Sequence, residues 1–263
     1  MRWLIAMDGW MVALGRRVID TFAAVLQFVR FSADLFRNLP SVFRNFHLTV
    51  EQMYLIGITS LPLVGLTSVF TGAVAAWQAA YNFADYVPLR YVGTAVGKSV
   101  MLEVGPVLTA MVVAGRVGAA MAAELGTMAV TEQLDAMRCL DLSPQRLLLA
   151  PRLLAGMIML PFLTIFSSCI AILGALAVVS LFKGLSHESF FAGVRLFYSD
   201  RDMVVGLFKS FVFGIWISLF GCFFGYHSSH GAEGVGRATM AAVVASNVAI
   251  LVSGFLLSNF LLN

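Results

Sequence analysis

Three short motifs carry residue types that elsewhere bind phosphate, metal ions or dinucleotides. Segment 93–99 (Gly-Thr-Ala-Val-Gly-Lys-Ser) resembles a phosphate-binding loop, but three residues separate its glycines where that loop has four. His227 and His230 are three residues apart, yet no third metal ligand lies near them in the sequence. The glycines of 231–236 do not match the dinucleotide fingerprint and follow an apolar stretch rather than a strand. No Ser-His-Asp or Cys-His pattern stands out either, so we expect neither a metal site nor enzyme activity in this chain.

Glu103 is a fourth candidate, because it lies well inside an apolar stretch. Residues 99–123 are apolar except for Glu103 and Arg116. An acidic residue at the centre of a membrane helix costs roughly 2.5–3.5 kcal/mol, so it should face a cavity or a partner. A glycine and a proline follow it directly, and we expect the helix to be irregular there. Two interpretations stay open: a polar point in a substrate cavity, or a carboxylate near the outer interface beside Lys98.

The composition is that of a membrane protein. Of 263 residues, 60% are hydrophobic and 12% are charged, against about 45–50% and about 25% in soluble domains. This composition excludes disordered chains and argues against soluble enzymes and nucleic-acid binders. The net charge of +3 is too small to define a partner. We expect Cys139, Cys169 and Cys222 to be buried thiols, not disulfide partners.

Apolar stretches predict an all-α polytopic membrane protein with five spans. Uncharged stretches cover residues 52–84, 153–182, 210–232 and 238–263, and 99–123 is the fifth candidate. The predicted spans are about 53–80, 97–126, 150–181, 205–226 and 238–261. The first stretch would reach ~50 Å as one helix, against ~30 Å of hydrocarbon. We therefore expect it to tilt or to end in a loop.

Before the first span, the sequence pattern changes to that of an amphipathic helix. Within residues 10–45, apolar side chains recur every three or four residues with arginines between them. Such a helix lies in the headgroup plane, so we predict an N-terminal interfacial helix here. Packing against a soluble partner is the alternative. The whole chain, 1–263, then forms one transmembrane domain.

Small residues form a ridge along the second span. They are spaced four apart, which places them on one helix face and lets a neighbouring backbone approach closely. The ridge consists of Ala110, Ala114, Gly118, Ala122 and Gly126. In the last span, Ala241, Ala245 and Ala249 repeat the spacing.

The segment between spans 2 and 3 is polar and predicts a short helix at about 130–140. Its pattern comprises Thr131, Glu132, Gln133, Leu134, Asp135, Met137 and Arg138, with the two apolar residues on one side. Pro144 fits the first position of the next helix. A charged helix at this place could dock on a cytosolic partner or be a solvated connector, and composition alone does not choose.

Basic residues predict the orientation. With five spans the termini lie on opposite sides, and an N-terminus inside gives the inner side more arginines. The inner set would be Arg2, Arg16, Arg17, Arg30, Arg37, Arg44, Arg116, Arg138, Arg146, Arg152 and Arg237. The outer set would be Arg90, Lys98, Lys183, Arg195, Arg201 and Lys209.

An ordered series of motifs, from about residue 10 to the end, resembles the MlaE/YrbE permease family. The matching segments are 102–107 (LEVGPV), 114–118 (AGRVG), 123–126 (AELG) and 131–137 (TEQLDAM). Segments 69–72, 151–152, 216–220 and 236–239 agree as well. Members of this family are membrane subunits of ABC transporters that move lipids between the inner membrane and MCE proteins.

The resemblance implies a set of partners and sites. It implies a permease homodimer, a cytosolic ABC ATPase dimer seated on the helix around Glu132, a periplasmic MCE hexamer and, as an optional subunit, a small STAS-type cytosolic protein. It also implies a phospholipid in an outward-open cavity at the dimer interface. The positions that match this cavity are Ala75, Asn82, Phe83, Tyr86, Leu102, Glu103 and Val104. Leu102 stands where the family often has arginine, and Asn82 is more polar than the cavity lining would suggest.

Together these observations predict the permease of an ATP-driven phospholipid transporter that maintains outer-membrane lipid asymmetry. The expected location is a Gram-negative inner membrane, with the N-terminus cytosolic and the C-terminus periplasmic. The chain itself is expected to hold no cofactor, and ATP and magnesium would bind the partner ATPase. An ion-coupled secondary transporter, a polytopic lipid enzyme and a related permease for sterol or another lipid are the alternatives.

Overall fold

The described part of the chain consists of helices, turns and short connections, without strands. The computed structural model describes residues 19, 22–40, 42, 46–83, 88, 90–196, 199–229 and 231–262. Five helical segments are long and apolar enough to cross a membrane: Phe46–Phe83, Tyr91–Val130, Gln145–Lys183, Asp200–Tyr226 and Gly231–Leu261. Each contains most or all of one predicted span, so the all-α polytopic prediction is confirmed.

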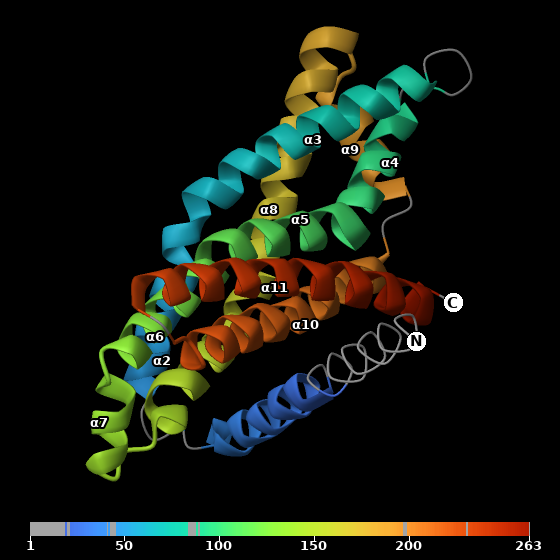
Figure 1. Cartoon of the computed structure of the whole chain (residues 1–263). Coiled ribbons are helices and arrows are strands. Elements are labelled where there is room, and N and C mark those ends of the chain that lie inside the picture. Colours follow the sequence, from blue (N-terminus) through green and yellow to red (C-terminus); the bar gives the residue numbers. More distant parts are fainter. Residues whose placement is uncertain are drawn as a thin grey trace, which may run out of the picture.

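Span 1 is divided rather than continuous. Helix α2 (Phe46–Ile56) leads through a short 3₁₀ turn, η2 (Ile58–Ser60), into α3 (Leu61–Phe83). The chain changes direction at this turn (Figure 1). Proline is accepted in a first helical turn because its missing N–H would have no partner there, which suits Pro62 at the start of α3. The bend accommodates the excess length that the uncharged stretch predicts.

Span 2 contains two π-helical turns, and each of them holds a charged residue. The order is α4 (Arg90–Ser99), η3 (Val100–Val104), α5 (Gly105–Val113), η4 (Ala114–Gly118) and α6 (Ala119–Val130). Glu103 lies in η3 and Arg116 lies in η4. The predicted irregularity beside Glu103 is therefore present. π-turns inside α-helices frequently mark functional sites.

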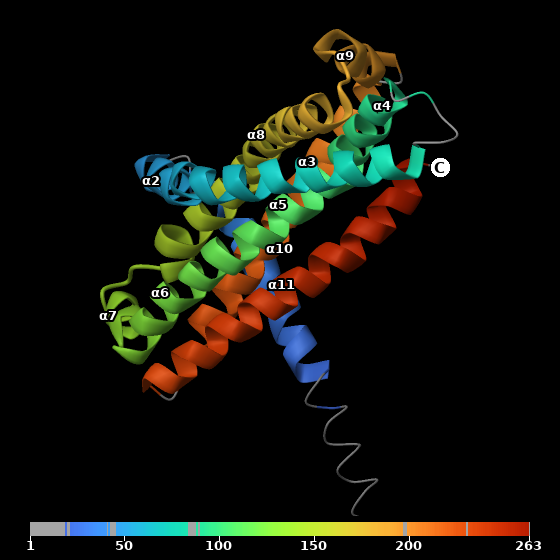
Figure 2. The same ribbon diagram turned by 90° about the horizontal axis from the view of Figure 1, so that it is seen from above.

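The remaining spans complete the bundle. They are η5 (Gln145–Leu149) with α8 (Ala150–Lys183), then α10 (Asp200–Tyr226) and α11 (Gly231–Leu262). The short helix α7 (Gln133–Cys139) lies at one end of the bundle, and α4 and α9 (His187–Leu196) lie at the other (Figure 1). Viewed along the other axis, α3 and α11 lie on opposite sides of α5 (Figure 2).

Helices α3 and α8 approach each other closely through glycine. A Cβ atom added at Gly72 would lie 1.8 Å from the carbonyl oxygen of Ala171, and one at Gly174 would lie 2.5 Å from that of Val69. Ser68 donates a 2.8 Å hydrogen bond to Ser167 across the same interface. Small residues and hydroxyl hydrogen bonds are how helices associate in lipid, where apolar burial gives no advantage.

Replacing Gly72 by alanine should separate these two helices. The new methyl group would collide with backbone, which cannot rotate away, so we expect a loss of about 1–3 kcal/mol in stability. Gly65→Ala is the matched control, because its Cβ would meet Phe166 at an ordinary 3.5 Å. Thermal unfolding of both variants in detergent measures the difference. Equal melting temperatures would show that the α3–α8 contact is not that tight.

The N-terminal helix is described in part. Residues 22–38 are helical, with Phe22, Val25 and Val29 exposed and Leu35 buried. Aromatic contacts join this segment to α10, since the Phe28 and Phe220 rings stack with centroids 4.8 Å apart. The rest of 10–45 lies largely outside the described residues, and its position in the headgroup plane stays a prediction.

The expectation that all three thiols are buried was wrong. Cys139 and Cys169 are exposed, and of the three thiols Cys222 alone is buried; all three are free. Helix α11 half-buries its alanine series within this chain. The buried line runs one residue further on, because the face that meets α6 and α10 is set by both neighbours rather than by alanine spacing alone. It consists of Ala238, Ala242, Ser246 and Ile250.

Candidate functional site

Glu103 belongs to a polar cluster formed by three spans. The Lys209 ammonium group, on α10, forms an ion pair with Glu103 Oε1 and donates a 2.8 Å hydrogen bond to Ser258 Oγ on α11. Ser258 in turn donates a 2.5 Å hydrogen bond to Glu103 Oε1. The Lys209 side chain is fully buried, whereas that of Glu103 is 42% exposed. In this ion pair the carboxylate is therefore accessible, whereas the ammonium group is buried.

The irregular backbone of span 2 supplies the third contact of this cluster. Pro106 has no N–H, so it cannot donate to the carbonyl of Leu102 four residues before it. That carbonyl accepts a 3.1 Å hydrogen bond from Lys209 Nζ instead. The Gly-Pro pair that follows Glu103 therefore frees a backbone oxygen that helps to hold the buried cation.

Lys209 is the residue that sequence reasoning misplaced. The sequence predicts an outer position because Lys209 borders the uncharged stretch that begins at Ser210, but the residue lies inside span 4. Two signals in the sequence could have located Lys209 in the membrane. It lies within a 27-residue apolar stretch, Asp200–Tyr226, and Glu103 in another span needs a cation. The alternative neighbour of Glu103, Lys98, lies 3.8 Å from Asp202 instead. Among the described residues, the near partners of Glu103 are thus Lys209 and Ser258.

The other residues predicted for the cavity fall into a second group. Ala75 and Phe83 on α3 pack against an apolar cluster that includes Val92, Val96 and Phe190. Asn82 is exposed, and Tyr86 lies outside the described residues. Leu102 is buried and Val104 is half-buried beside Glu103. The α3 residues and the Glu103 cluster thus belong to different packing groups of one chain.

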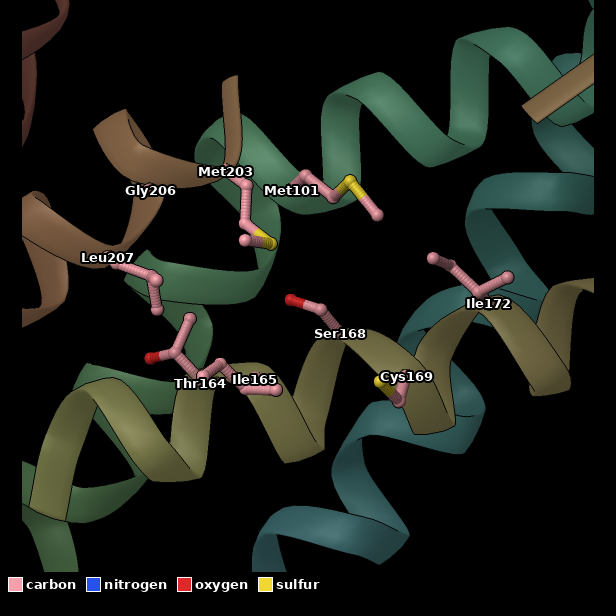
Figure 3. A pocket seen from close by; sticks show the side chains of 9 residues that line it. All are labelled: Met101, Thr164, Ile165, Ser168, Cys169, Ile172, Met203, Gly206 and Leu207. Atoms are coloured by element: carbon pink, nitrogen blue, oxygen red, sulfur yellow. The ribbon is translucent and has the colours of Figure 1, made fainter. Parts of the chain in front are cut away.

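A half-open apolar cavity of about 80 Å³ lies between η3, α8 and α10. Figure 3 shows Met101 and Met203 on one side of it and Ser168 and Cys169 on α8 on the other. Pockets for drug-sized ligands usually measure about 300–1,000 Å³, so this cavity is too small for a phospholipid. It contains none of the residues predicted for the lipid cavity.

The ridge of small residues on span 2 faces the bundle. All five of its members are buried. Added Cβ atoms at Gly221 and Gly225 of α10 would lie 3.2 Å and 2.9 Å from the carbonyl oxygens of Gly118 and Ala122. The ridge thus lies against α10 within one chain.

The polar segment after span 2 projects from the end of the bundle. Helix α7 begins at Gln133, and Glu132 before it has a left-handed backbone (φ 59°). Leu134 is 4% exposed and anchors the segment, and Met137 is half-buried. The exposed residues are Thr131, Glu132, Gln133, Asp135 and Arg138. The segment therefore presents polar side chains outward from a fixed position.

Arg138 ties α7 to the end of span 4. Its guanidinium donates hydrogen bonds to the Tyr226 hydroxyl and, at 2.6 Å, to Asp135 Oδ1. The hydrogen bond to Tyr226 is the main cause that raises the pKa of Arg138 above its usual value, so this side chain is charged at every physiological pH. Displacement of α7 would therefore be transmitted to α10.

The motifs that resembled phosphate and metal sites are packing elements. Gly93 and Gly97 are helical, within α4, and an added Cβ at Gly93 would lie 2.4 Å from the carbonyl oxygen of Phe190 on α9. His227 packs against the Phe223 ring at 4.7 Å, and His230 lies outside the described residues. Among the residues that the structure describes, no group of three potential metal ligands comes together.

Comparisons with known proteins agree with this architecture. The family model described as "Permease MlaE" matches residues 49–260. The chain is 36% identical to a probable ABC transporter permease protein of Rickettsia bellii, over 94% of this chain and 95% of that one. It is 34% identical to the intermembrane phospholipid transport system permease protein MlaE of Haemophilus influenzae, again over 94% and 95%. It is 36% identical to the chloroplastic protein TRIGALACTOSYLDIACYLGLYCEROL 1 of Arabidopsis thaliana, over 81% of this chain and 61% of that one.

The family match covers residues 49–260, and the relatives align over most of both chains. The chain belongs to the MlaE permease family of ABC transporter permeases.

Proposed function

We propose that this chain is the membrane subunit of an ATP-driven transporter that moves phospholipid between the inner membrane and a periplasmic MCE protein. The observation that carries the proposal is the similarity, over almost the whole of both chains, to a relative named as an intermembrane phospholipid transport permease. In a Gram-negative cell this activity would maintain the lipid asymmetry of the outer membrane. The chain would act as a homodimer, with the lipid in a cavity between the two copies.

The Glu103–Lys209–Ser258 cluster supports a role in handling a lipid headgroup. The Glu103 carboxylate is half-exposed and is paired with the buried ammonium group of Lys209. It therefore offers a negative oxygen to a ligand, although the ion pair as a whole is neutral. A zwitterionic headgroup could approach it without leaving an unpaired charge in the membrane. Because Lys209 already neutralises Glu103, the pair offers no free carboxylate of the kind that ion-coupled transport needs, which disfavours that alternative.

The energy source would be a separate ATPase that binds ATP and magnesium. The segment Thr131–Arg138 would be seated on this ATPase, and a small STAS-type protein would be an additional cytosolic subunit. Movement of the segment Thr131–Arg138 on ATP binding would reach α10 through the hydrogen bond between Arg138 and Tyr226. The cavity would then contract and shift lipid towards or from a periplasmic MCE hexamer.

The proposed orientation places the N-terminus in the cytosol and the C-terminus in the periplasm. Basic residues within the five spans, among them Arg116, Arg152 and Lys209, do not contribute to the count in the loops. Of the basic residues outside the spans, six lie in the N-terminal segment and Arg138 lies in the loop after span 2, against Arg90 and Arg195 in the other connections. The loop side with α7 is thus assigned to the cytosol.

Native mass spectrometry of the complex purified from its own membrane tests this function. We expect two copies of the chain, an ATPase dimer and bound phospholipid. Reconstitution of that complex should give lipid transfer that requires ATP. Lipid movement by the purified chain alone under an ion gradient, or a bound sterol in place of phospholipid, would contradict the proposal.

A further inference from the structure

Arg116 is a charged side chain inside span 2 without an acidic partner in the described part of the chain. Its hydrogen bond among the described residues runs from Nη1 to Ser60 Oγ at 2.6 Å. A guanidinium group has five N–H donors, so most of its donor capacity is unused. An unpaired cation inside a membrane span is costly unless it faces water or an anion.

A cavity opens beside this side chain. It measures about 230 Å³ and lies between α2, η2, η4 and α6, where Arg116 lines it together with Gln52, Thr59 and Glu124. Gln52 has no side-chain hydrogen bond among the described residues, so its amide is available to a ligand. This cavity is larger and more polar than the one beside Met101 and Met203.

The net charge of the cavity selects an anion. Glu124 is the acidic residue that lines it, and its carboxylate is held at 2.9 Å by Arg152 Nη2 on α8. The Arg152 side chain is 2% exposed, so a buried cation neutralises the Glu124 carboxylate. What remains is the single positive charge of Arg116, which matches one phosphodiester group.

The position of the cavity selects the source of that anion. Arg116 is 13 residues from Glu103 towards α7, which corresponds to ~20 Å along a helix. The cavity therefore lies in the half of the membrane nearer to α7, and it is too far from Glu103 for one headgroup to touch both. A phosphate group at that depth arrives on a membrane lipid rather than from solution.

From these observations we propose a second headgroup site in span 2, at which Arg116 binds the phosphate of a phospholipid from the leaflet on the α7 side. Gln52 donates a further hydrogen bond, and the π-turn η4 turns Arg116 towards the cavity. The substrate class rests on the proposed function; the site itself rests on Arg116 and the cavity. Lipid would then occupy two positions along span 2, one at Arg116 and one at Glu103.

Photolabelling of the purified complex in lipid nanodiscs tests the site. The probe is a phosphatidylethanolamine with a diazirine on its upper acyl chain, and adducts are mapped by peptide mass spectrometry. We expect adducts on 46–59 and 116–124 as well as near Glu103. Arg116→Gln should lower the adducts on the first two segments about tenfold, as for loss of a charge-assisted hydrogen bond, and leave those near Glu103 unchanged. Arg116→Lys should retain most of them.

Two controls separate the possible failures. Arg195→Gln removes an equal charge from the exposed surface of α9 and should change neither set of adducts. A diacylglycerol probe, which has no phosphate, should label 46–59 and 116–124 weakly, and soluble glycerophosphoethanolamine should not compete.

Adducts near Glu103 alone, or equal yields in Arg116→Gln, would overturn the second site and leave the proposed function standing. Absence of adducts at both places would contradict the proposed function as well. Competition by the soluble compound would overturn the lipid as the source.

Discussion

Lys209→Met should abolish lipid transport and destabilise the chain, because it removes the cation that neutralises Glu103 inside the membrane. Removing one partner of a buried ion pair costs about 3–5 kcal/mol, and we expect the lower end since the Glu103 side chain is 42% exposed. The change also leaves the Leu102 carbonyl, which Pro106 cannot satisfy, without its donor. Thermal unfolding and ATP-dependent lipid transfer by the reconstituted complex measure the two effects.

The double variant Lys209→Met with Glu103→Gln distinguishes stability from function. With both charges removed the span carries no unpaired ion, so most of the lost stability should return while transport stays absent. Arg237→Met is the control. Its partner Glu233 is 3.9 Å away and both side chains are largely exposed, 65% and 82%, so it should cost less than about 1 kcal/mol. Full transport by the double variant would mean that the cluster is structural only.

Charge reversal at Glu132, directly before α7, should release the ATPase without unfolding the permease. Glu132 is exposed, whereas Leu134 is buried and its replacement would disturb packing instead. Glu132→Arg places a positive charge where the proposed partner meets an acidic one, and it leaves the ion pair between Asp135 and Arg138 intact. We expect recovery of the ATPase in a pull-down to fall at least about tenfold, since like charges facing each other cost several kcal/mol.

Glu188→Arg provides the control for that experiment. Glu188 is exposed on α9, at the opposite end of the bundle, so its reversal should leave the pull-down unchanged. Arg138 must be left intact, because it ties α7 to Tyr226 and its loss would move the segment itself. Normal recovery of the ATPase with Glu132→Arg would show that the partner docks elsewhere.

Much of the architecture follows from the sequence because its cause is local. Apolar stretches of sufficient length must become helices in a membrane, where every backbone group needs an internal partner. The polar segment after span 2, the helix that begins at Pro144 and the small-residue ridge are likewise readable from residue type and spacing. The bend in span 1 is foreseen in outline, since one straight helix of that length would exceed the bilayer.

What the sequence by itself determined is therefore the number and place of the spans, the family and the one acidic residue that needed a partner in the membrane. The tertiary structure decided which partner. Lys209 and Glu103 are more than one hundred residues apart, and Arg116 and Ser60 come from different spans, so no periodicity relates them. The rotation of each helix about its own axis, fixed by close contacts such as Gly72 with Ala171, determines which polar groups meet. That rotation depends on all neighbours at once, and for this reason both polar sites on span 2 became visible only in the folded chain.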